Sequence, residues 1–179
     1  LLTHTSGLPP YAPTSELEKQ YGSPSPDGMI EYIANCRRDF KPQTDFQYSC
    51  LNYITLQRII ETVSGQSLRD FARENLFDVF GMTHTDYLPC KRDKDGKWIN
   101  TADAHWATST EGDWHSLIAP TEKQSDGSVL CGQVHDPLAR VMNGGISGNA
   151  GVFSCAEDIA VLCAALQNCG EWNGHRILS

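Results

Sequence analysis

The stretch 51–65 limits the fold of this chain most, because it carries the clearest helical pattern in the sequence. Its apolar residues recur at helical spacing, at Leu51, Ile54, Ile59, Ile60 and Val63. Gly65 follows the last of them, and glycine readily takes the left-handed conformation that ends many helices. The pattern predicts a helix that runs from about residue 51 to this glycine.

Three other segments carry start signals for a helix. The segment 26–36 opens with a serine N-cap, a proline at the first helical position and an aspartate in the first turn. The segment 67–81 opens with the capping sequence Ser-Leu-Arg-Asp and closes on a glycine. In the segment 154–170, Ser154 and Glu157 form a capping box ahead of an apolar stripe. We expect a helix in each of the three.

Between residues 87 and 135 the sequence keeps neither a strand period nor a helix period for long. Asp, Gly, Ser, Thr and Trp dominate, which predicts long loops with a short hairpin. Within this region, 91–97 resembles a calcium loop superficially. It has basic residues between the acids and lacks the glutamate that would bind calcium in a bidentate manner, so we interpret it as a solvated turn.

Bulk composition excludes several classes of function. A formal charge of −8, without a basic stripe, argues against a nucleic-acid partner. The longest apolar runs, such as 159–166, are far shorter than the roughly 20 residues of a membrane-spanning helix. With 179 residues, 40% of them hydrophobic, a single domain is the default interpretation.

Cysteine and histidine spacing offers no metal motif and no cofactor site. The seven cysteines include no CxxC pair, and the six histidines include no HExxH. Cys155 and Cys163 are expected on one helix about 12 Å apart, too far for a disulfide. We therefore predict that most of the cysteines are buried or free thiols.

Four strings, in this order and spacing, resemble the serine beta-lactamase-like family, which includes class C beta-lactamases, D-alanyl-D-alanine carboxypeptidases and related esterases. They are 1–9 (LLTHTSGLP), 46–53 (FQYSCLNY), 118–122 (IAPTE) and 134–154 (VHDPLARVMNGGISGNAGVFS). The segment 75–85 (NLFDVFGMTHT) looks like the same family. The similarity covers nearly the whole chain apart from 90–117, which we interpret as a loop insertion.

The resemblance implies a fold class that is mainly α with long loops, the helical part of the α+β beta-lactamase/transpeptidase-like fold. Because the first residues read like the end of an apolar helix, we expect 1–179 to be a single helical segment that is truncated at both ends. The parent protein would pack this segment against a sheet-containing half, with the active site between them.

The family also implies an enzyme that uses a Ser-x-x-Lys, a Tyr-x-Asn and a Lys/His-x-Gly motif. This chain carries only the middle one, so the parent would be a hydrolase while the isolated chain would be inactive. The implied reaction forms an acyl-enzyme on a beta-lactam, a D-amino-acid peptide or an ester, and it needs no cofactor. Family members usually act in the periplasm or outside the cell.

Tyr48 is the candidate catalytic residue of this middle motif. A serine hydroxyl needs a group that accepts its proton, and a phenol beside lysine ammonium groups can have its pKa lowered enough to serve. Tyr48 also precedes a predicted helix start, where the helix dipole favours an anion. Taken without the resemblance, it would be an ordinary aromatic residue packed at a loop.

Cys50 stands where the family motif has Asn or Asp, and we assign it to substrate binding. A thiol is a weak hydrogen-bonding group, so this position would orient a substrate amide poorly. Asn52 could supply an amide instead, although residues two apart do not share a helix face. Cys50 could also act as a replacement nucleophile, because a helix N-terminus lowers the pKa of a thiol.

Asn149 lies in the glycine-rich loop 143–151, which the family places on a wall of the active-site cleft. By that resemblance Asn149 lines the substrate pocket, and a purely structural turn is the alternative. His4 and His135 fall within family-like strings, and we interpret both as structural.

Two other functions remain open at this stage. The parent protein could have lost catalysis and kept its cleft for ligand binding or sensing, which the cysteine at position 50 would suit. The chain could also be a structural domain without any ligand. A Ser-x-x-Lys motif upstream would favour the enzyme, because the family's nucleophile lies there.

Overall fold

The computed structural model describes residues 1–102, 104–106 and 113–178. Its helices are α1 (Thr14–Tyr21), α2 (Pro26–Asn35), α3 (Cys50–Ser64), α4 (Leu68–Ala72), η1 (Arg73–Phe77), α5 (Asp78–Phe80), η3 (Trp114–Leu117), η4 (Leu138–Met142) and α6 (Ala156–Gln167). Of these, η1 and η4 are π-helical, and η1 links α4 to α5 without a break. No helix of the described residues is long and apolar enough to cross a membrane.

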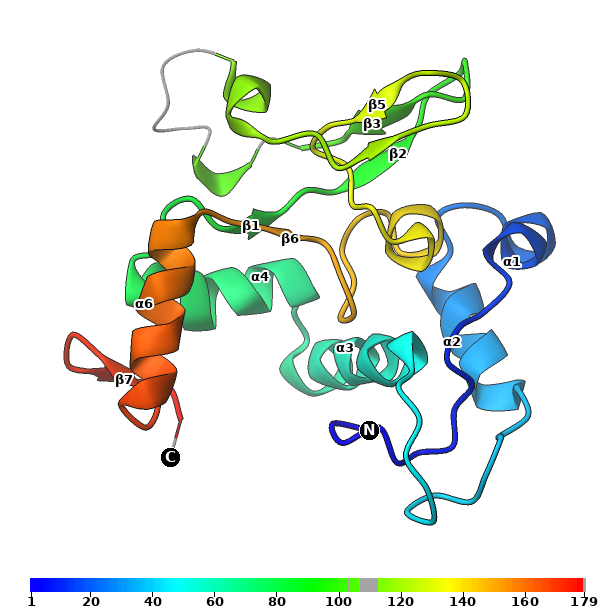
Figure 1. Cartoon of the computed structure of the whole chain (residues 1–179), viewed down its shortest axis with the longest axis horizontal. Coiled ribbons are helices and arrows are strands. Elements are labelled where there is room, and N and C mark those ends of the chain that lie inside the picture. The colour runs from blue at the N-terminus through cyan, green and yellow to red at the C-terminus, as the bar shows by residue number, and fades with distance from the viewer. Residues whose placement is uncertain (103, 107–112, 179) are drawn as a thin grey trace.

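The described strands form four antiparallel pairs. They are β1 (Asp86–Tyr87) with β6 (Val152–Phe153), β2 (Cys90–Arg92) with β3 (Trp98–Asn100), β4 (Glu122–Lys123) with β5 (Val129–Leu130), and β7 (Glu171–Trp172) with β8 (His175–Arg176). Three pairs are local hairpins, whereas β1 and β6 come from distant parts of the chain. Figure 1 shows α1, α2 and α3 on one side, α4 and α6 on the other, and the β2–β3 hairpin near β5 above them.

Two apolar clusters hold the helices together. In the first, side chains of α1, α2, α3 and η4 pack against one another: Leu17, Met29, Ile33, Leu51, Ile54, Leu138 and Met142. In the second, Phe77 and Phe80 pack against Ala165 of α6. Burial of these side chains supplies most of the favourable free energy of such an arrangement. Leu51, the second residue of α3, belongs to the first cluster.

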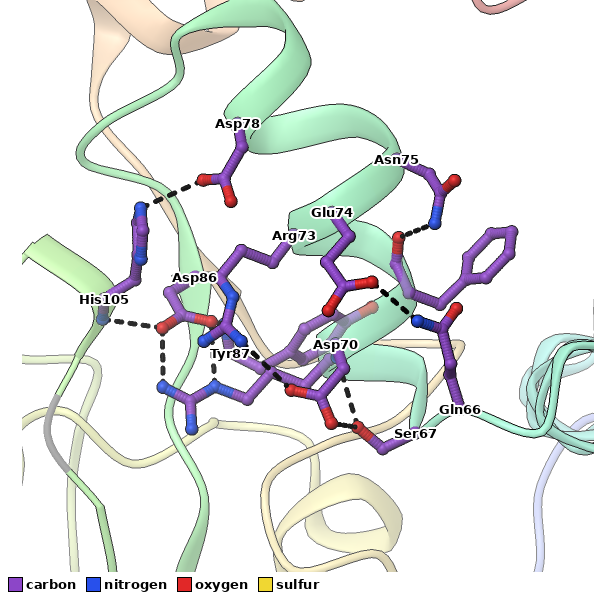
Figure 2. Close-up of polar contacts among 12 residues, drawn as sticks. Gln66, Ser67, Asp70, Arg73, Glu74, Asn75, Asp78, Asp86, Tyr87 and His105 are labelled. Atoms are coloured by element: carbon purple, nitrogen blue, oxygen red, sulfur yellow. Dashed lines mark hydrogen bonds and ion pairs between the residues drawn. The ribbon is translucent and has the colours of Figure 1, made fainter.

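A buried carboxylate joins α4 to β1. Asp86 is fully buried and accepts two hydrogen bonds from the Arg69 guanidinium, at 2.9 and 2.6 Å (Figure 2). It also accepts the backbone N–H of His105 at 2.7 Å, and the His105 ring lies 3.0 Å from Asp78. The hydrogen bonds to Asp86 raise the pKa of Arg69. This network holds the chain in place where it leaves the helical layer for the loops.

The expected helices at 26–36, 51–65, 67–81 and 154–170 are confirmed as α2, α3, the continuous α4–η1–α5 and α6. Gly65 and Gly81 both take left-handed conformations at the helix ends, as expected. Ser67 caps α4, because its hydroxyl accepts the backbone N–H of Asp70.

One cap position was right and one was wrong. Ser25 is the N-cap of α2, as expected, although its side chain makes no cap hydrogen bond. The N-cap of α6 is Cys155 rather than Ser154, and it makes no such bond either. The Ser154 hydroxyl instead lies 2.7 Å from that of Thr85.

The described part of 87–135 has the expected long loops, with two hairpins. The segment 91–97 is the turn of the β2–β3 hairpin, and residues 93–97 close it through backbone hydrogen bonds. Residues 103 and 107–112, which belong to the predicted insertion, lie outside the described residues. All seven cysteines are free, as predicted.

Candidate active site

Tyr48 lies directly before the N-cap of α3 and turns toward solvent. Its side chain is 59% exposed. The following residue, Ser49, is buried; its hydroxyl accepts the Leu51 backbone N–H at 3.2 Å and donates to the Pro9 carbonyl at 2.6 Å. The N-terminal segment and the helix start therefore hold the backbone on which Tyr48 is displayed.

His4 supports the Tyr48 ring from the N-terminal segment. The two ring centroids lie 4.6 Å apart. Nδ1 of His4 accepts the Ser49 backbone N–H at 3.1 Å, so in the neutral ring the proton is on Nε2. His4 thus connects the aromatic ring to the helix start. The sequence indicates a structural role for His4, and the only signal for this position is its place in the string 1–9.

Cys50 is a polar neighbour of the Tyr48 phenol. Its Sγ lies 4.0 Å from the phenol oxygen. The pKa of Tyr48 is raised, first by the negative charge that Cys50 can carry, then by the hydrogen bond with Cys50, and then by desolvation. The expected lowering of this pKa is therefore not found in this chain, because the groups that act on Tyr48 here are acidic rather than basic.

Asn52 does not replace the missing amide of the motif. It is fully buried, and its Oδ1 accepts a hydrogen bond from the Ser6 hydroxyl at 2.5 Å. Its Nδ2 lies 3.1 Å from Nδ1 of His4. The side chain is directed inward, where it contacts Ser6 and His4 of the N-terminal segment.

Asn149 is on a loop that packs against α3. A Cβ on the neighbouring Gly148 would lie 2.1 Å from the Tyr53 carbonyl oxygen, so this close approach requires glycine. The Gly148 N–H donates to Gln57 at 3.0 Å. Asn149 itself accepts a hydrogen bond from Ser147 at 2.7 Å, and no contact among the described residues joins it to Tyr48. The structure therefore brings Tyr48 and Cys50 together, whereas the side-chain hydrogen bond of Asn149 is to Ser147.

Comparison with known proteins identifies the family. Residues 1–178 match the Beta-lactamase family model, and the chain therefore belongs to the beta-lactamase family. An Escherichia coli protein, provisionally named D-alanyl-D-alanine carboxypeptidase, is 32% identical over 174 residues, which cover 96% of this chain and 38% of that protein. The N-acetylmuramyl-L-alanine amidase of Bacillus subtilis is 30% identical over 174 residues, with the same coverage of both chains. The chain spans about two fifths of the length of these curated relatives.

Solved structures confirm the beta-lactamase/transpeptidase-like fold. A penicillin binding protein from Bacillus halodurans superimposes with a TM-score of 0.62 at 23% identity, over 99% of this chain and 46% of that one. A D-stereospecific amidohydrolase from Streptomyces sp. gives 0.60 at 16% identity, over 99% of this chain and 46% of that one. At these identities the likeness establishes the fold alone.

Proposed function

We propose that the full-length protein containing this chain is a serine hydrolase that cleaves peptide amides next to D-amino acids through an acyl-enzyme. The name of the Escherichia coli relative supports this substrate class, because a D-alanyl-D-alanine carboxypeptidase cleaves an amide next to a D-amino acid. The nucleophile and the Lys/His-x-Gly motif would come from the remainder of the protein, which acts in the periplasm or outside the cell. No cofactor enters this reaction.

The exposed phenol of Tyr48 at the start of α3 is the observation that carries the proposal. In the proposed step, the Tyr48 phenolate accepts the proton of the serine hydroxyl while the serine oxygen attacks the amide carbonyl. The phenol then gives that proton to the leaving amine. His4 keeps the ring in place from behind, and the positive end of α3 favours the phenolate.

A positive charge from outside this chain has to offset the acidic surroundings of Tyr48. Cys50 and Asp136 both raise its pKa, so the phenolate would be scarce at neutral pH in the isolated chain. The lysine of a Ser-x-x-Lys motif would supply that charge. This requirement explains why we place the activity in the full-length protein and expect none from the 179 residues alone.

Cys50 and Asn149 would contribute to substrate binding. We propose that Cys50 meets the substrate amide beside Tyr48, where its thiol holds the amide less firmly than an asparagine would. A Cys50→Asn variant should therefore lower KM. Asn149 would need to turn from Ser147 to reach the same substrate.

A fluorescent penicillin, followed by intact mass, tests the proposed function. The full-length protein should gain one adduct, and the Tyr48→Phe variant should be labelled about 10²–10⁴ times more slowly. Tyr32→Phe is the matched control, because Tyr32 lies on α2 and does not contact Tyr48. Equal labelling rates for the Tyr48→Phe variant and the wild type would contradict the role of the phenol.

A non-catalytic ligand-binding protein is the second candidate, and the acidic surroundings of Tyr48 and the cysteine at position 50 favour it. It would bind penicillin reversibly without an adduct. A nucleophilic Cys50 would instead give an adduct on the 179-residue chain that disappears in Cys50→Ala. A structural domain would show neither binding nor labelling.

A further inference from the structure

Three side chains that can bind a metal converge at the start of α6, away from Tyr48. His84 lies in the turn before β1, Cys155 is the N-cap of α6, and Asp158 lies in its first turn. One nitrogen, one sulfur and one oxygen atom from these residues all lie within 4.8 Å of one another. No closely spaced sequence motif contains this group, because His84 is far from the other two residues along the chain.

The hydrogen bonds around this group leave ligand atoms available. Asp158 is buried, and its Oδ2 accepts the His84 backbone N–H at 2.8 Å and the Thr85 hydroxyl at 2.7 Å. No described residue hydrogen-bonds to its Oδ1. The Thr83 hydroxyl lies 3.2 Å from Nδ1 of His84 and can fix the ring while Nε2 binds, in the way that outer partners orient ligand histidines.

A cavity of about 610 Å³ adjoins the group. His84 and Cys155 contribute to its wall together with Trp106, Ser154 and Phe153. His84 is exposed and Cys155 is half-buried, so both can be reached from the cavity. A metal bound by the three side chains would have a coordination position open to water or to a small ligand.

We propose that His84, Cys155 and Asp158 form a zinc site whose fourth position faces this cavity. Zinc accepts thiolate, imidazole and carboxylate ligands in tetrahedral geometry, and sites with three protein ligands keep one open position. A thiolate and a carboxylate together balance the charge of Zn²⁺. Tetrahedral ligands are roughly 3.3–3.8 Å apart at zinc bond lengths of about 2.0–2.3 Å, so the three ligand atoms, now within 4.8 Å of one another, would draw closer on binding zinc.

Zinc binding would release a proton and connect two elements. The Cys155 thiol loses its proton to solvent as its sulfur bonds to zinc, so the affinity rises with pH. The bound metal then links the turn before β1 to the start of α6. Because the unfolded chain does not hold these three groups together, zinc should raise the melting temperature.

Titration of the reduced, full-length protein with Co²⁺ tests the site directly. We expect one cobalt per protein, with a thiolate-to-cobalt charge-transfer band in the near ultraviolet and the visible bands of tetrahedral cobalt, both displaced by Zn²⁺. Cys155→Ser should abolish the charge-transfer band, and His84→Ala should weaken binding by more than about tenfold. Cys163→Ser, which changes an exposed thiol on the same helix, should bind like the wild type.

Two results would overturn the zinc site. One is the absence of a charge-transfer band with excess cobalt, and the other is a band that survives in Cys155→Ser. Weaker cobalt binding by His84→Ala would not be caused by unfolding, because His84 is exposed and its truncation removes no buried side chain. The readout is spectroscopic and needs no hydrolase activity, so failure here leaves the proposed function of Tyr48 untouched.

Discussion

Helices α3 and α6 both begin near a Ser-Cys dipeptide, but they use different residues of it as the N-cap. The serine is the N-cap of α3, whereas the cysteine is the N-cap of α6, so α6 begins one residue later relative to the dipeptide. In α3, Ser49 is the N-cap, and its hydroxyl accepts the Leu51 N–H. In α6 the N-cap is Cys155, which makes no side-chain cap hydrogen bond, and Ser154 lies outside the helix. The same local sequence therefore does not decide where a helix begins.

The partners of the two serine hydroxyls explain the difference. Ser49 is buried and donates to the Pro9 carbonyl while it accepts the helix N–H, so both bonds favour the same cap position. Ser154 is exposed and pairs with Thr85, whose hydroxyl also donates to Asp158. At α6, a tertiary contact with the turn before β1 takes the place of the local cap.

The largest effect should come from Asp158→Ala. The substitution leaves the His84 N–H and the Thr85 hydroxyl without their shared acceptor, which should lower the free energy of unfolding by about 2–4 kcal/mol. Urea unfolding in the presence of a chelator measures the effect without any metal. Glu157→Ala removes the same charge from the same helix turn at an exposed position, and should cost at most about 1 kcal/mol. Equal losses in the two variants would show that charge, rather than the buried hydrogen bonds, fixes α6.

Ser49→Ala should have the next largest effect. It removes the N-cap hydrogen bond of α3 and leaves the Pro9 carbonyl without its donor, a loss of about 1–2 kcal/mol in the free energy of unfolding. The same urea measurement applies. A loss below about 0.5 kcal/mol would mean that packing of the first cluster, and not the cap, sets the start of α3.

The sequence predicts α2, α3, the α4–η1–α5 block and α6 because their signals are local. It does not predict α1 and η4, for physical reasons. The N-cap of α1 is Pro13, which offers no side-chain cap hydrogen bond, and only Leu17 of this helix is buried. All of η4 is buried, so its residues lack the alternation of apolar and polar positions that marks an amphipathic helix.

Ser154→Ala should have a small effect on the free energy of unfolding. This is so although Ser154 and Glu157 match the capping-box pattern, whereas Ser49 is followed three residues later by Asn52. The exposed hydroxyl pairs with Thr85 and makes a long bond to the Cys155 carbonyl, but it does not cap α6, so we expect a loss of at most about 0.5 kcal/mol. If Ser154 did cap the helix, its replacement by alanine would lower the free energy of unfolding by about 1 kcal/mol. Urea unfolding of this variant beside Ser49→Ala distinguishes a serine that caps its helix from one that does not.

The candidate site could be predicted in part, because Tyr48 and Cys50 are close in sequence. Their pairing needs only the turn that opens α3, and the structure places the two groups 4.0 Å apart. The inward direction of Asn52 depends on His4 and Ser6, which lie far away along the chain. The convergence of His84 with Cys155 likewise depends on the pairing of β1 with β6, which no local pattern indicates.

The smallest effect should be a change in the pKa of Tyr48, which we expect from substitution of Cys50 at the start of α3 but not of Cys155 at the start of α6. Cys50 is the largest cause of the raised pKa of Tyr48, so Cys50→Ala should lower that pKa toward its ordinary value of 10.0. NMR titration of a tyrosine labelled at Cζ follows this ionisation in the intact protein. Cys155→Ala is the control and should leave the Tyr48 titration unchanged, because Cys155 is not among the groups that act on this phenol. A pKa that stays high in Cys50→Ala would assign the shift to desolvation and Asp136, and a change to asparagine at position 50 would then not make Tyr48 a better base.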